Sequence, residues 1–197
     1  SFILPKVEIG SLTFKNPIVV EFPSDESGET IIWEDPNREK KVPEVVGQLG
    51  RGLLKNVNLL LDMESSKMIL TDNLKSLKKD GYDLEMFEKV PFKLGSKGIV
   101  IEVDTDLGRM RLLLDTGFTV TTMHDFLYPK DIKKKMSPYG LPECMTAQFT
   151  INKTNFGSQK LYFLKMTEEL RDIDGVLGMD FIEKHVIYIN FSITPSG

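Results

Sequence analysis

The sequence has very few of the side chains that build disulfide frameworks and metal centres. Its 197 residues include one cysteine, Cys144, and two histidines, His124 and His185. One cysteine cannot form an internal disulfide, and a structural zinc site would lack sulfur and imidazole ligands. No serine or cysteine nucleophile stands in a recognisable motif near either histidine, which argues against a catalytic triad. We therefore expect no metal and no cofactor.

Long apolar stretches and an excess of positive charge are also missing. No apolar run approaches the roughly 20 residues that cross a bilayer, and residues 1–5 lack the basic region of a signal peptide. Lys and Arg total 25 against 29 Asp and Glu, a balance that disfavours a nucleic-acid partner. We expect a soluble chain without a membrane span, extracytoplasmic if an upstream signal was removed.

The segment that says most about a catalytic function is residues 111–118. An apolar run ends at Leu114 and is followed directly by Asp115, Thr116 and Gly117. The run before the aspartate is typical of a buried strand, so the carboxylate would stand at a turn where that strand ends.

A second motif begins sixty residues after the aspartate. It consists of two apolar residues between glycines, namely Gly175, Val176, Leu177 and Gly178. Residues 175–182 also match residues 47–54 at an offset of 128, and residues 187–190 then fall on residues 59–62. In both copies a glycine turn would lead into a short helix and then a strand, which indicates an internal repeat.

The repeat extends upstream at a different offset. Ile9 and Phe14 match Ile151 and Phe156 at an offset of 142, so the first copy carries 14 extra residues, which fit the polar segment 24–29 as a surface loop. Subtracting 142 from 115 gives −27, so the counterpart of Asp115 would precede residue 1.

The repeat predicts three parts in the chain. Residues 1–70 would be the C-terminal part of a first lobe, 71–91 a charged linker with short helical turns, and 92–197 a complete second lobe. We expect the missing first half of the first lobe to lie upstream.

Local patterns predict an all-β second lobe. Residues 98–104 and 109–114 read as a hairpin, and residues 149–151 and 160–164 read as another. Residues 131–136 read as a short surface helix, and residues 186–191 as a closing strand. Short strands with turns between them favour a closed, barrel-like lobe.

With both motifs in place, the chain resembles the retropepsin and pepsin class of aspartic peptidases, especially its bacterial retropepsin-like members. The resemblance covers residues 92–191 fully and 7–70 in degenerate form. It implies that Asp115 is catalytic, that Thr116 braces its counterpart across a pseudo-twofold axis, and that Gly117 allows a close turn. It also implies that the second motif, from Gly175 to Gly178, packs beneath the aspartate as a ψ-shaped loop.

Two features depart from the family pattern. Phe118 stands where a small residue commonly follows the glycine, and it cannot hydrogen-bond the carboxylate. The interval that would form a substrate flap, residues 137–146, contains two prolines; Tyr139 and Gly140 are its only flap candidates, and an ordinary loop is the favoured interpretation.

Other acidic residues have simpler explanations. Asp62 follows three leucines, but Met63 and Glu64 replace the threonine and glycine, so it is not the missing partner. Asp180 opens a predicted helix, where capping and the helix dipole explain an acidic residue. Asp115 itself could simply anchor a turn.

Three functions follow from these observations. The leading one is an aspartic endopeptidase that cleaves peptide or protein substrates with water activated between two carboxylates, the second lying on a missing N-terminal segment. In the second, two copies of the chain pair their Asp115 residues across a dimer axis. In the third, the chain is a catalytically inactive peptide-binding or structural relative.

Overall fold

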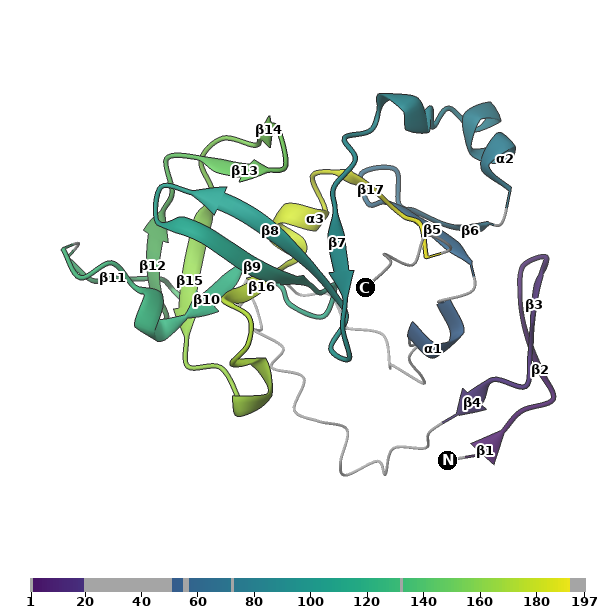
Figure 1. The fold of residues 1–197 in the computed structure, drawn as a ribbon, viewed down its shortest axis with the longest axis horizontal. Coiled ribbons are helices and arrows are strands. Elements are labelled where there is room, and N and C mark those ends of the chain that lie inside the picture. The colour runs from purple at the N-terminus through teal and green to yellow at the C-terminus, as the bar shows by residue number, and fades with distance from the viewer. Residues whose placement is uncertain (1, 20–50, 55–56, 72, 132, 192–197) are drawn as a thin grey trace.

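The computed structural model describes residues 2–19, 51–54, 57–71, 73–131 and 133–191. Most of its elements are β-strands with a few short helices, which confirms the predicted all-β class (Figure 1). The segments 24–29 and 47–50, to which we assigned a surface loop and the first glycine turn, lie outside the described residues.

The largest sheet forms the body of the molecule. The predicted closure into a barrel is wrong: among the described residues the pairing is an open path whose end strands are two residues long and have one neighbour each. In spatial order the strands are β11 (Lys135–Met136), β12 (Pro142–Met145), β15 (Lys160–Leu164), β10 (Thr122–His124), β16 (Gly175–Leu177), β9 (Gly108–Leu114), β8 (Ile99–Thr105), β13 (Phe149–Ile151) and β14 (Thr154–Asn155), with β7 (Phe92–Leu94) also paired to β8.

The hairpin of β8 and β9 is the centre of this sheet and was predicted from its sequence. Buried residues alternate along β8, as expected where one face of a strand meets the core. The turn is held by Thr105, whose Oγ1 accepts from the Leu107 N–H and donates to the Gly108 carbonyl, each at 3.0 Å. Gly108 has a φ of 116°, a value that L side chains rarely adopt.

Two local predictions are wrong. Strands β13 and β15 do not pair with each other: β13 pairs with β8 and β14, whereas β15 pairs with β10 and β12. The helix predicted over 131–136 is wrong: Lys135–Met136 form strand β11, and the helical turn of this region, η2 (Asp125–Leu127), ends before residue 131. In both cases pairing with other strands of the sheet overrides the local pattern.

A separate three-stranded sheet joins two segments that are far apart in the sequence. It has the order β17 (Val186–Ile189), β5 (Asn58–Asp62) and β6 (Lys67–Thr71). Leu59 pairs with Ile189, Leu60 with Tyr188 and Leu61 with Ile187. At an offset of 128, Leu59 corresponds to Ile187, Leu60 to Tyr188 and Leu61 to Ile189. The offset therefore exchanges the two outer pairs with each other and leaves the central pair unchanged.

A similar correspondence links two hairpins at an offset of 142. Strands β2 (Lys6–Ile9) and β3 (Leu12–Lys15) are joined by a two-residue turn, as are β13 and β14. The first turn residue is left-handed in both: Gly10 has a φ of 58° and Asn152 a φ of 53°. Short strands β1 (Phe2–Ile3) and β4 (Ile18–Val19) pair at the base of the first hairpin.

The helices are short. α2 is capped by Asn73, whose side chain accepts from the Lys75 N–H, and it buries Leu77 completely. Among the described residues, no helix has the length and apolar character needed to cross a membrane. The helical elements besides η2 are α1 (Arg51–Leu54), α2 (Leu74–Lys79), η1 (Leu84–Met86), η3 (Glu168–Leu170) and α3 (Met179–Ile182).

Candidate functional site

Asp115 lies where β9 ends, beside the parallel strand β16. Its N–H donates to the carbonyl of Leu177 at 3.2 Å, which continues the ladder by one residue beyond the Leu114–Leu177 pair. The N–H of Gly117 donates to the Asp115 carboxylate at 2.8 Å. The side chain is half-buried. The aspartate is thus held by the turn that follows it, with one carboxylate oxygen facing a backbone donor.

The two glycines of the second motif are required by close backbone contacts. A Cβ at Gly178 would lie 2.6 Å from the carbonyl of Val120, and one at Gly175 would lie 2.7 Å from the sulfur of Met123. Real Cβ atoms essentially never come this close to other heavy atoms. Between them, Val176 and Leu177 are almost completely buried. The motif therefore packs β16 tightly beneath the 115–123 segment.

A polar network fixes the same segment to α3. Asp180 accepts from both the N–H and the Oγ1 of Thr121, each at 2.8 Å, and the Gly178 N–H donates to that Oγ1 at 3.2 Å. Burial raises the pKa of Asp180. The carboxylate thus ties the strand-end loop to the helix. Sequence reasoning missed Thr121, because its partner is 59 residues away.

Phe118 has a structural explanation. Its half-buried ring packs against a second apolar cluster formed by Leu113, Ile173 and Val176. A serine or threonine at this position would lose that contact. Phe118 therefore departs from the family pattern at a position where its ring packs against an apolar cluster.

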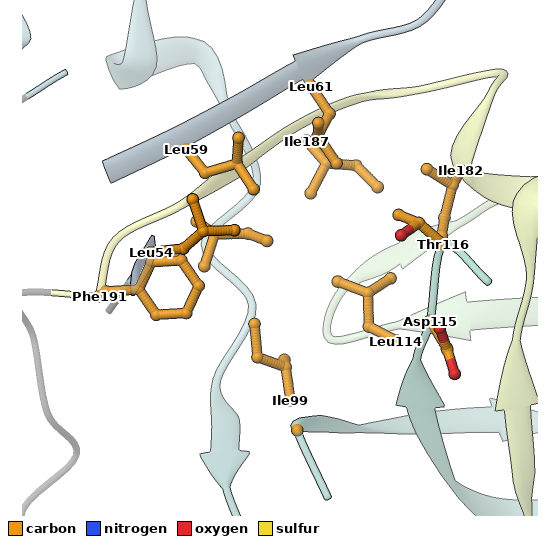
Figure 2. Close-up of a pocket in the computed structure, with 12 residues that line it drawn as sticks. Leu54, Leu59, Leu61, Ile99, Leu114, Asp115, Thr116, Ile182, Ile187 and Phe191 are labelled. Carbon is orange, nitrogen blue, oxygen red and sulfur yellow. The ribbon is translucent and has the colours of Figure 1, made fainter. Parts of the chain in front are cut away.

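A pocket of about 270 Å³ adjoins Asp115. Figure 2 shows Leu59, Leu61 and Ile187 on one side of it and Leu114, Asp115 and Thr116 on the other. The walls are almost entirely aliphatic, with the aspartate and threonine as their polar members. Its remaining lining residues are Leu54, Gly98, Ile99, Ile182, Ile189 and Phe191.

The interval 137–146 forms a hairpin instead of the loop that the sequence favoured. β11 and β12 pair antiparallel, and the Ser137 N–H donates to the Leu141 carbonyl at 2.8 Å. Tyr139 lies in the tip, 6.0 Å from the ring of Tyr162 on β15, and Gly140 has a φ of 72°. Neither residue belongs to the walls of the pocket beside Asp115.

The base of this hairpin contains a buried carboxylate that sequence reasoning missed. Glu143 on β12 is 4% exposed, and Lys135 and Lys160 reach its oxygens at 2.8 and 3.6 Å. The hydrogen bond from Lys135 lowers the pKa of Glu143. These ion pairs hold the hairpin to the neighbouring strand β15.

The Asp62 side chain binds Tyr82, which follows α2, and the turn after β5. The Tyr82 hydroxyl donates to its Oδ2 at 2.7 Å, and the Ser65 N–H donates to its Oδ1 at 3.0 Å. The hydrogen bond from Tyr82 is the largest cause of a lowered pKa at Asp62. This carboxylate therefore stabilises the turn after β5 and its contact with Tyr82.

The histidines are also used in packing. His124 is buried, and its Nε2 lies 3.2 Å from the Leu170 carbonyl. His185 stacks on Phe181 with ring centroids 4.2 Å apart, and its Nδ1 lies 2.8 Å from the Phe181 carbonyl. Within the described part of the chain, no group of three or more His, Cys, Asp or Glu residues is placed to hold a metal ion.

Comparisons with known proteins find solved structures similar to part of this chain. No protein-family model and no curated protein matches the sequence. The chain is similar to the retropepsin-like aspartic protease from Rickettsia conorii, with a TM-score of 0.36 and 17% identity over 50% of this chain and 85% of that one. It is also similar to EIAV protease complexed with the inhibitor HBY-793, with a TM-score of 0.27 and 14% identity over 50% of this chain and 90% of that one. About half of this chain therefore lies outside each match.

Proposed function

We propose that the chain is part of an aspartic endopeptidase in which Asp115 supplies one of two catalytic carboxylates. The observation that carries this proposal is the position of Asp115. It stands at the end of a strand that is packed on the glycine motif, its carboxylate accepts from the Gly117 N–H, and it lies in the wall of an aliphatic pocket.

The chemistry requires a second carboxylate about 3 Å away, because two such groups share one proton and divide the roles of acid and base. The base takes a proton from water as that water attacks the peptide carbonyl, and the acid protonates the leaving nitrogen. In this scheme Gly117 fixes the orientation of Asp115, and Thr116 braces the opposite half-site. The second carboxylate would come from another Asp-Thr-Gly segment, upstream of the chain or on a partner chain.

The proposed division into a partial first lobe (1–70), a linker (71–91) and a second lobe (92–197) is supported by two correspondences. In the pairing of β5 with β17, residues that correspond at the 128 offset take equivalent positions. At the 142 offset, the turn residues Gly10 and Asn152 correspond and both have a left-handed backbone. The hairpin that carries Tyr139 and Gly140 is the candidate flap in this arrangement.

The experiment is Asp115→Asn in the protein expressed from its own gene, with Asp131→Asn as the matched control on an exposed surface. Losing an acid–base group should reduce peptide hydrolysis by about 10²-fold or more. The control should cleave at the wild-type rate. Unchanged hydrolysis by the Asp115→Asn variant, together with failure of pepstatin-type transition-state mimics to bind, would refute the proposal.

A second candidate function is a peptide-binding relative without catalysis. The feature that favours it is Phe118, which fills the place of a hydrogen-bonding neighbour and packs into the second apolar cluster. In that case Asp115→Asn should leave peptide affinity unchanged, and wild-type protein should bind peptides without cleaving them.

A further inference from the structure

Phe118 closes the turn that holds the Asp115 carboxylate. Its N–H donates to the Asp115 carbonyl at 3.3 Å, and the two ends of such a four-residue turn lie within about 7 Å of each other at their Cα atoms. The residues between them, Thr116 and Gly117, are small and exposed. The large apolar side chain of this turn therefore belongs to Phe118.

Two adjacent residues of β9 divide the apolar surroundings of Asp115 into two regions. Leu113 and Leu114 follow each other in the strand, so their side chains point to opposite faces. Leu114 lines the pocket shown in Figure 2, whereas Leu113 belongs to the second apolar cluster. The Phe118 ring packs against that cluster and is not part of the pocket walls. The aspartate thus stands between a pocket on one face and a region occupied by Phe118 on the other.

The second apolar cluster is accessible at its edge. Its three defining residues are at most 6% exposed, but the side chains packed around them are only partly buried, namely Val100, Phe118, Met166 and Leu170. A small residue at position 118 would uncover part of the buried three and leave a recess beside the turn. The phenylalanine ring occupies that space.

The backbone of Phe118 is fixed on both sides. Besides the bond from its N–H to Asp115, its carbonyl accepts from the Met179 N–H at 2.7 Å. The ring can therefore leave the cluster only by a change of side-chain rotamer, and that change would give up its apolar contacts. A peptide bound at Asp115 meets a filled space on this face.

An extended peptide places successive side chains on opposite sides. The two residues that flank a cleaved bond therefore point in opposite directions, and when that bond lies at Asp115 one of them points toward the face that carries Phe118. The size of the space on this face then decides which residues a substrate carries there.

We propose that Phe118 determines substrate specificity by closing this face, so that the residue on one side of the cleaved bond must be small, such as glycine, alanine or serine. This inference rests on the proposed function, because it takes Asp115 as the point of cleavage. A single methylene group in an apolar pocket changes kcat/KM by about 10–200-fold. A phenylalanine ring is therefore large enough to set the preference.

The test compares the cleavage profiles of the protein expressed from its own gene and of its Phe118→Ala and Phe118→Leu variants. The substrate is a peptide library in which the residues flanking the cleaved bond vary, and mass spectrometry identifies the products. Phe126→Ala is the matched control, because Phe126 is 68% exposed and belongs neither to the cluster nor to the pocket walls. Phe118→Leu keeps an apolar side chain on the cluster, so it decides the question if the alanine variant fails to fold.

We expect the wild-type protein and the control to cleave where one flanking residue is small. Phe118→Ala should raise kcat/KM for a peptide with leucine at that position, relative to its alanine analogue, by about 10-fold or more. Phe118→Leu should raise the same ratio by less, and the preference on the other side of the bond should not change. Identical profiles in the wild type and both variants, or a wild type that accepts leucine and phenylalanine on both sides, would overturn the proposal.

This outcome is separable from that of Asp115→Asn. Hydrolysis that depends on Asp115 but has the same profile in every Phe118 variant leaves the proposed function standing and removes this inference. If the wild-type protein binds peptides without cleaving them, calorimetry with the alanine and leucine peptides replaces the profile. Phe118→Ala should then favour the leucine peptide by about 10-fold relative to the wild type, and an unchanged ratio of affinities would contradict the role of Phe118.

Discussion

Gly178→Ala tests whether the close contact beneath Asp115 is as tight as the structure indicates. The added Cβ would lie 2.6 Å from the carbonyl carbon and oxygen of Val120 and 2.8 Å from the carbonyl oxygen of Phe118. The backbone of Gly178 has a φ of −95°, which alanine can adopt, so the effect would come from these contacts alone. All three neighbouring atoms are backbone atoms, so no side chain can turn away to make room.

Overpacking of this kind costs about 1–3 kcal/mol of unfolding free energy. For a chain of this size, that loss lowers the midpoint of thermal unfolding by about 2–12 °C. Scanning calorimetry and urea unfolding both measure the effect. Gly95→Ala is the control, because an added Cβ there meets nothing within 4 Å, and its unfolding free energy should change by no more than about 0.5 kcal/mol. Equal stability of the two variants would refute the argument from close approach.

Two further predictions concern carboxylates away from Asp115. Tyr82→Phe removes the main cause of the lowered pKa at Asp62, so a carboxyl NMR titration should find that pKa closer to its ordinary value. A lowered pKa stabilises the fold above the unfolded-state pKa and loses this effect as pH falls; the variant should therefore be weaker at neutral pH and similar to wild type in acid, and an unmoved titration would contradict this. Burial raises the pKa of Asp180, so stability declines as pH rises from the unfolded-state pKa through the folded-state one. Asp180→Asn keeps an acceptor for Thr121 and should unfold at the same or higher urea concentration at pH 7, whereas Asp180→Ala should lose about 1–3 kcal/mol; equal losses would show that the charge itself is needed.

The parts of the fold that depend on neighbours in sequence could be predicted. The β8–β9 hairpin was expected over 98–104 and 109–114 and is found over Ile99–Thr105 and Gly108–Leu114. Both strands are rich in β-branched or other apolar residues, and the turn between them carries a threonine and a glycine, so the signal is contained in one short window. The short helical turns within 71–91 were visible for the same reason.

Pairing between distant strands could not be predicted. Residues 149–151 and 160–164 were expected to pair because they are close in sequence, yet each finds partners elsewhere in the sheet. Strand β11 was missed for another reason: its partner β12 is the next strand along the chain, but β11 has only two residues and gains its place from that pairing. Short strands of this kind carry little preference of their own, and the sheet around them decides their conformation.

The surroundings of Asp115 could be predicted from the sequence only in part. The sequence showed both the aspartate and the glycine motif, but it could not show that Leu177 would continue the β9 ladder or that Asp180 would bind Thr121. Those contacts span about sixty positions of the chain. The apolar pocket could not be predicted either, because its walls combine residues from segments that are far apart in the sequence.

The pairing of β17 with β5 also sets the order in which the chain can fold. During synthesis residues 58–71 emerge well before residues 186–189, the strand that covers one edge of β5. Until then the edge of an entirely buried strand stays open to pairing with other chains. Contacts between residues this distant in sequence also form slowly. Loss of residues 186–189 would therefore leave an aggregation-prone edge on β5.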